Sequence, residues 1–179
     1  MTFHQNRQAR LNGSKNSKKQ NDLITYNKQT LTLKMKNLVF LAHIGTTLYL
    51  VGVVWSVQLL VYPSMANVGA EGYAGYHNLH TSRITPVVAP AMIIELLTAI
   101  YFVFAPAEKI DYRYFGIGLI LVLIIWASTF FVQVPLHDKL IQGFDGDIQK
   151  RLVLTNWIRT IAWSLRGALA LWMVWQKIK

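Results

Sequence analysis

Four long apolar segments constrain the fold of this chain more than any other feature. They cover approximately residues 37–63, 84–105, 112–134 and 154–176. Each exceeds the roughly 20 residues that an α-helix needs to cross about 30 Å of hydrocarbon. Lipid offers the main chain no hydrogen-bond partner, so spanning segments of this kind form α-helices. The sequence therefore predicts an all-α fold, a four-transmembrane-helix bundle over residues 37–179.

Composition agrees with this class and excludes several others. Apolar residues make up 53% of the chain and charged residues 15%, against about 25% charged residues in soluble domains. The chain has no cysteine, which excludes disulfides, thiolate zinc sites and iron–sulfur clusters. It contains no HExxH, GxSxG, Walker A or GxGxxG string, so the common hydrolase, zinc-protease and nucleotide-binding functions have no support.

Residues 1–36 are expected to form a disordered, basic, cytoplasmic tail. They hold eight Lys/Arg and one acid out of a net charge of +10, and few residues that pack. The charge would hold the tail near the anionic inner leaflet. Phe3 and Tyr26 are its only aromatic residues, so nucleic-acid binding is not predicted. The run Met35-Lys36-Asn37 also has the form of a start site before a membrane helix.

The distribution of positive charge predicts the orientation in the membrane. Twelve Lys/Arg lie in the tail, in the connection near residue 110 and at the C-terminus, and four lie in the other two loops. By the positive-inside rule both termini are cytoplasmic, in a plasma or inner membrane. The lipid bilayer is thus the expected partner, and the oligomeric state is left open.

The two halves of the chain resemble each other as helical hairpins, 37–105 and 112–176. Each has a glutamine, Gln58 or Gln133, a few residues before a proline. Gln58 precedes Arg83 by 25 residues, and Gln133 precedes Arg159 by 26. This match suggests a duplication, although so short a pattern also arises by chance.

Polar and aromatic side chains recur at helical spacing near the predicted outer ends of the spans. Lipid would penalise each charged group by about 2.5–3.5 kcal/mol, so these stripes are expected to face inward. They predict an outer-facing pocket, or vestibule, that binds a small hydrophobic molecule. The alternative for the glutamines is interhelical hydrogen bonding worth about 0.6–2 kcal/mol. The predicted ligand-binding residues are Trp55, Gln58, Tyr62, Arg83, Gln133, His137, Asn156, Trp157 and Trp163.

Arg159, His77 and His80 are the predicted catalytic residues. An arginine within a span favours an anion or a polarised carbonyl oxygen, and two histidines at i, i+3 share a helix face and are suited to proton transfer. A metal or haem site at these histidines, with His137 and Glu95, is the alternative. No second spaced ligand pair accompanies them, so no metal is assigned, and the cofactor is left unknown.

Glu95 and Arg166 are predicted to form a buried ion pair. They lie 11 and 12 residues inside the outer starts of their spans, which is about 16 and 18 Å deep at 1.5 Å per residue. An opposite charge at the same level is the simplest way to stabilise either group. The alternative is a protonated Glu95 that hydrogen-bonds a neighbouring helix.

The stretch Thr155-Asn156-Trp157-Ile158-Arg159-Thr160, with Val134-Pro135-Leu136-His137 and Tyr62-Pro63, resembles the anthrone-oxygenase-like group of small four-helix membrane proteins. The resemblance covers residues 37–176. It implies an oxygenase or oxidoreductase acting on a lipophilic, quinone-like or polycyclic molecule. The alternative is a non-catalytic membrane protein that binds or carries a small amphiphile, or a subunit of a membrane complex; the sequence does not decide whether the chain is an enzyme.

Overall fold

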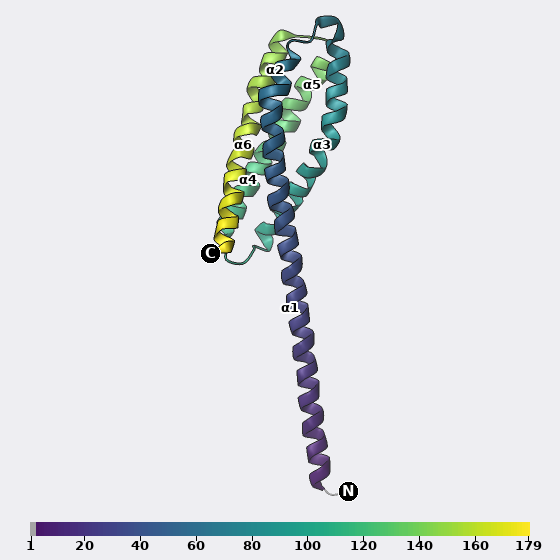
Figure 1. Ribbon diagram of the computed structural model, residues 1–179, viewed down its shortest axis with the longest axis vertical. Helices are drawn as coiled ribbons and strands as arrows, with labels where there is room; N and C mark the ends of the chain where they lie inside the picture. The colour runs from purple at the N-terminus through teal and green to yellow at the C-terminus, as the bar shows by residue number, and fades with distance from the viewer. Residues whose placement is uncertain (1–2) are drawn as a thin grey trace. The chain divides into compact units, whose positions relative to one another are not determined.

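The computed structural model describes the main chain of residues 3–179 and the side chains from residue 19 onward, residue 22 excepted. The described part is all-helical and contains no strand, as Figure 1 shows. In chain order its elements are α1 (Phe3–Ser56), the π-helix η1 (Val57–Val61), α2 (Tyr62–Met65), α3 (Ala70–Phe104), α4 (Tyr112–Ser128), the π-helix η2 (Thr129–Gln133), α5 (Val134–Ile141) and α6 (Gly146–Ile178).

Among the described residues, three helical stretches are long and apolar enough to cross a membrane: Lys19–Met65, Ala70–Phe104 and Tyr112–Ile141. The predicted membrane class and three of its spans are therefore supported. The fourth predicted span lies in α6, which is also a long helix. It does not meet the same criterion of apolar length, so its passage through the membrane stays a prediction.

The chain divides into two compact units, one ending at Val39 and the other covering Phe40–Lys179. The division lies close to the predicted boundary at residue 36. For residues 3–36 the structure has α1 where the sequence predicts disorder, and residues 1–2 lie outside the described part. The described side chains from Lys19 to Lys34 are exposed except for that of Thr30. Disorder of this segment in solution stays a prediction.

Two π-helices occur, one in each of the two hairpins. The amide of Tyr62 donates to the carbonyl of Val57, and the amide of Val134 donates to the carbonyl of Thr129. A proline follows each donor, and proline has no N–H to continue the α-helical ladder. The wider turn brings in one extra residue, as π-bulges do. The two π-helices are offset by 72 residues, whereas Gln58 and Gln133 are offset by 75, so this irregularity does not follow the register of the predicted duplication.

Two apolar clusters hold the unit Phe40–Lys179 together. One lies among α1, α3, α4 and α6 and consists of Leu50, Val54, Met92, Ile125, Ala162 and Trp163. The other lies among η1, α2, α3, α5 and α6 and consists of Val57, Tyr62, Met65, Tyr73, Leu136, Leu140 and Leu152. Helix α6 packs closely on α4 and α5. Figure 1 shows these helices running along one common direction.

The helices extend beyond the predicted apolar segments at one end of the bundle. α3 begins at Ala70, within the connection of residues 64–83, for which the sequence predicts a loop or a short helix. Its first turns are held by Tyr73, which is buried and donates a hydrogen bond of 2.5 Å to Gln149 of α6. α6 begins at Gly146, where the Asp145 carboxylate accepts from the amides of Asp147 and Ile148. Such N-capping stabilises a helix start by about 1 kcal/mol.

Candidate functional site: a cavity with a buried arginine

A cavity of about 450 Å³ lies within the helices of Phe40–Lys179. It is bordered by both apolar clusters and by side chains from every long helix of this unit. Most of its wall is apolar, with Leu50, Val54, Met92 and Ile84 as examples. Its principal polar and aromatic lining residues are Tyr62, His80, Thr81, Thr85, Trp126, Thr129, Gln133, His137, Asp138, Asn156, Arg159 and Trp163. A hydrophobic cavity with a few converging polar groups is the usual form of a small-molecule site.

Arg159 of α6 is the cation of this cavity. Its Nη1 donates to Oδ1 of Asn156 at 3.3 Å, and its guanidinium carbon lies 5.2 Å from the ring centroid of Trp163. Its Nε is buried and has no hydrogen-bond partner. Among the described residues no carboxylate forms an ion pair with Arg159. The guanidinium therefore offers a positive charge and an unused donor to a molecule in the cavity.

Tyr62, His137 and His77 form a hydrogen-bonded chain at one side of the cavity. The Tyr62 hydroxyl lies 2.9 Å from Nε2 of His137, and Nδ1 of His137 lies 2.9 Å from Nε2 of His77. Tyr62 and His137 line the cavity. His77 is fully buried behind His137, and its Nδ1 has no hydrogen-bond partner.

His80 lines the cavity beside this chain, and its ring is stacked on that of His137 at 6.2 Å. Within the described residues, no group of three or more His, Asp or Glu side chains is arranged to hold a metal ion. Both ring nitrogens of His137 and Nε2 of His77 are instead directed at one another and at Tyr62. The arrangement is suited to hydrogen bonding and proton transfer.

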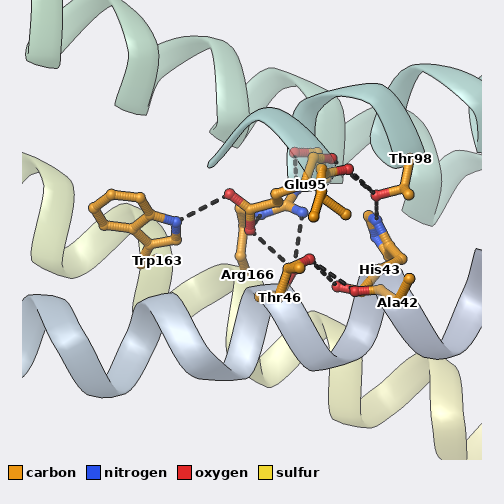
Figure 2. Close-up of polar contacts among 10 residues, drawn as sticks. Ala42, His43, Thr46, Glu95, Thr98, Trp163 and Arg166 are labelled. Carbon is orange, nitrogen blue, oxygen red and sulfur yellow. Dashed lines mark hydrogen bonds and ion pairs between the residues drawn. The ribbon is translucent and has the colours of Figure 1, made fainter. Parts of the chain in front are cut away.

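The ion pair of Glu95 and Arg166 adjoins the cavity. Nε of Arg166 lies 2.8 Å from Oε1 of Glu95, and both side chains are buried. The structure thus brings the two residues into the direct contact that their depths predict. Figure 2 shows this contact together with His43 and Thr98, whose Nδ1 and Oγ1 are 2.9 Å apart.

Further donors surround the same carboxylate. Thr47 donates to Oε1 at 2.9 Å, and the indole nitrogen of Trp163 donates to Oε2 at 3.1 Å. Nη1 of Arg166 donates to the carbonyl of Gly118, where a Cβ would lie 3.3 Å from that nitrogen. Three side chains thus donate to Glu95, and the absence of a side chain at residue 118 leaves room for the guanidinium. Because Trp163 also faces Arg159, this network positions one wall of the cavity.

Several predicted ligand-binding residues lie outside the cavity. Gln58 is buried between η1 and α6, where its Oε1 accepts from Asn156 at 2.8 Å and from Thr160 at 3.3 Å. These contacts match the alternative given for the glutamines, which is hydrogen bonding between helices and not ligand binding. Arg83 is exposed. His77 reaches the cavity only through His137.

Of the three tryptophans predicted to bind the ligand, Trp55, Trp157 and Trp163, only Trp163 lines the cavity. Trp55 and Trp157 contact each other edge to face at 5.7 Å, and the Trp55 side chain is 37% exposed. Neither lines the cavity, whereas Trp163 does. The indole nitrogen of Trp55 donates to Ser164 at 3.0 Å, which directs this side chain along the outside of α6.

The wall contributed by α3 was not predicted. Thr81, Thr85, Val88 and Met92 line the cavity at spacings of three and four residues. Their shared helix face was a readable signal, since Thr85, Val88 and Met92 lie within the predicted span 84–105. Trp126 also lines the cavity, and its indole nitrogen is buried without a hydrogen-bond partner.

The described chain is thus an all-helical protein with three candidate membrane-spanning helices and a cavity that is partly open to the surface of the bundle. Comparison with protein-family models, with curated proteins and with solved structures finds no match. The resemblance to the anthrone-oxygenase-like group therefore rests on the quoted sequence stretches alone.

Proposed function

We propose that this chain is an integral membrane protein that binds a lipophilic small molecule, with an anionic or carbonyl oxygen of that molecule placed at Arg159. The observation that carries the proposal is the buried Nε of Arg159, which has no hydrogen-bond partner beside a cavity of about 450 Å³. An unused buried donor on a charged group costs about 1–3 kcal/mol or more. A bound oxygen atom would remove that cost.

The apolar wall of the cavity supports a lipophilic body for this molecule. Tyr62, His137, Gln133 and Asn156 line the same space as Arg159 and would fix the orientation of its polar end. Trp126 supplies a second unpartnered donor, which suits a ligand with another hydrogen-bond acceptor. A quinone-like or other oxygenated amphiphile has this combination of groups.

We also propose that α6 is the fourth membrane span. Its two internal arginines face inward, where Arg166 pairs with Glu95 and Arg159 meets Asn156 and Trp163. The charges that lower its average hydropathy are therefore not presented to lipid. The large exposed side chains along its central part are apolar: Leu154, Ile158, Ile161, Leu165, Leu171 and Trp172.

With four spans, the distribution of Lys and Arg places both termini in the cytoplasm and the Tyr62–His137 side of the cavity toward the outer face of a plasma or inner membrane. The described bundle is compatible with this arrangement. Tyr62 and His137 come a few residues before the connections at residues 66–69 and 142–145, which would be the two outer loops.

A second candidate function is catalysis on the bound molecule, as an oxygenase or oxidoreductase. Its support is the sequence resemblance together with the hydrogen-bonded chain of Tyr62, His137 and His77. The cofactor and the substrate of such a reaction stay open. Binding or carriage of an amphiphile needs fewer assumptions and is the function that the geometry supports best.

Native mass spectrometry of the protein released from gently solubilised membranes tests the proposal, with absorption spectroscopy of the extracted molecule. We expect a bound lipophilic compound with an acidic or carbonyl oxygen, and its loss in Arg159→Gln. The matched control is Arg113→Gln, an exposed arginine at the start of α4. Equal occupancy in the wild type and Arg159→Gln would contradict the proposal.

A further inference from the structure

The hydrogen-bonded chain beside the cavity has two self-consistent directions. In the first, the Tyr62 hydroxyl donates to Nε2 of His137, and Nδ1 of His137 donates to Nε2 of His77. His77 then carries its remaining proton on Nδ1, which has no partner. The Tyr62 hydroxyl is 2.9 Å from His137 and 3.4 Å from Oε1 of Gln133, and the shorter contact favours this direction.

In the second direction every one of these protons is shifted. Nε2 of His77 donates to His137, Nε2 of His137 donates to the Tyr62 oxygen, and the Tyr62 hydroxyl donates to Oε1 of Gln133. Gln133 is available as that acceptor because its amide nitrogen donates to Thr155 at 2.9 Å. Nδ1 of His77 is then a bare lone pair. The two directions differ by one proton passed along the chain.

We propose that Tyr62, His137 and His77 form a proton relay between the cavity and the buried Nδ1 of His77. This inference rests on the proposed function, because the cavity must hold a molecule that gives up or accepts a proton. It narrows the ligand class to lipophilic weak acids with a phenolic or enolic O–H group. Tyr62 is the group that meets the ligand, whereas His77 acts only through His137.

For a bound phenol, the relay moves one proton from the ligand to His77. Its O–H bond breaks, the electron pair stays on the oxygen, and the resulting oxyanion is stabilised by Arg159. The proton joins the Tyr62 oxygen, the Tyr62 proton passes to Nε2 of His137, and the Nδ1 proton of His137 passes to Nε2 of His77. His77 keeps its own proton on Nδ1 and becomes an imidazolium, so the proton given up by the phenol is held on His77. No oxidant or reductant is needed.

The charged and titratable groups around the relay come from several helices. His80 of α3, Asp138 of α5 and Arg159 of α6 line the cavity with Tyr62 and His137. Tyr73 stacks on His77 at 5.5 Å and does not line the cavity. Because Arg159 is in the cavity wall, it favours an anion there. A relay that carries the ligand's proton to His77 keeps that positive charge away from the Arg159 guanidinium.

Stopped-flow fluorescence with a heptyl-substituted umbelliferone tests the relay on the full chain in lipid nanodiscs. The phenol and phenolate forms of this probe have different excitation spectra, so the rate of anion formation is separate from the affinity. We expect His77→Gln to bind the probe with about the wild-type Kd and to form the anion roughly 10²-fold more slowly, the lower end of the usual range for a general acid–base group. Tyr73→Phe is the control, because it keeps the ring beside His77 and does not line the cavity.

The outcomes separate the two proposals. A wild-type rate in His77→Gln overturns the relay and leaves the binding function standing. If the wild-type protein does not bind the probe, or if Arg159→Gln binds it equally well, the proposed function is wrong and the relay falls with it.

Should His77→Gln not fold, nitrogen NMR of histidine-labelled Tyr62→Phe and Tyr73→Phe decides the question. The relay requires changed His137 and His77 signals only in Tyr62→Phe. Wild-type signals in that variant would overturn the relay.

Discussion

Trp163 and Glu95 connect the cavity to the buried ion pair. The indole nitrogen of Trp163 lies 3.1 Å from Oε2 of Glu95, and Nε of Arg166 lies 2.8 Å from Oε1 of the same carboxylate. The same indole ring stands 5.2 Å from the guanidinium carbon of Arg159. Glu95 therefore does more than neutralise Arg166. It holds the side chain against which the cation of the cavity packs.

Glu95→Gln and Arg166→Gln are each expected to destabilise the protein strongly. Removing one partner of a buried pair leaves the other charge uncompensated, which costs about 3–5 kcal/mol. The double variant should recover part of the loss, because two amides can hydrogen-bond each other. Unfolding in mixed detergent micelles measures the three variants, and strictly additive losses would show that the residues are not coupled.

Trp163→Phe should weaken ligand binding with a modest effect on stability. Phenylalanine keeps an aromatic face toward Arg159 but cannot donate to Glu95, a loss of about 1–2 kcal/mol. Binding of the umbelliferone probe and the apparent Tm in detergent are the measurements. Trp55→Phe removes an equivalent N–H bond, to Ser164 at the outside of α6, and a parallel loss of binding in both variants would argue against a local effect at the cavity.

The membrane class and the pairing of Glu95 with Arg166 were accessible from sequence because depth in a span follows from residue number and helix rise. Which side chains share a cavity depends on helix rotation. The π-helices before Pro63 and Pro135 change that rotation by one residue, and so hydropathy alone could not separate Gln133, which lines the cavity, from Gln58, which does not.

The helical start of α3 shows a different reason for error. Residues 70–83 contain glycine, asparagine and serine, which read as a loop. Tertiary contacts outweigh these local preferences: Tyr73 and His77 are fully buried against α5 and α6. This segment supplies His77, His80 and Thr81, and its helix continues into the span that carries Thr85, Val88 and Met92 on the same wall of the cavity.

The orientation in the membrane gives a direct test of the proposed fourth span. Reporter fusions at Gly143 and at the C-terminus should lie on opposite sides of the membrane, because α6 lies between them. Alkaline phosphatase and green fluorescent protein fusions give complementary signals in this assay. Reporters on the same side would mean that α6 does not cross, and the proposal of four spans would be abandoned.

Deletion of residues 1–34 should leave the folded part of the chain intact. The compact unit Phe40–Lys179 is separate from the residues up to Val39, and the described side chains from Lys19 to Lys34 are almost all exposed. We expect the same apparent Tm in detergent and the same yield of folded protein. Circular dichroism of the isolated segment should show little helix in water, because a polar helix without a packed face is not stabilised. A large loss of folded protein on deletion would show that residues 1–34 are needed for folding.

Gln58 and Gln133 lie in the two π-helices, Gln58 second in η1 and Gln133 last in η2, and are expected to respond differently to the same change. Gln58→Met removes acceptors for Asn156 and Thr160 and should lower stability by about 1–3 kcal/mol, with probe affinity retained. Gln133→Met removes the bond to Thr155 and an acceptor for Tyr62, and because Gln133 lines the cavity it should weaken probe binding roughly fivefold or more, equivalent to about 1 kcal/mol. Titration of each variant with the umbelliferone probe, beside its melting curve, separates the two effects. If Gln58→Met loses affinity as Gln133→Met does at equal stability, the cavity must extend past Asn156 to Gln58, which would then have to be counted among the residues that bind the ligand.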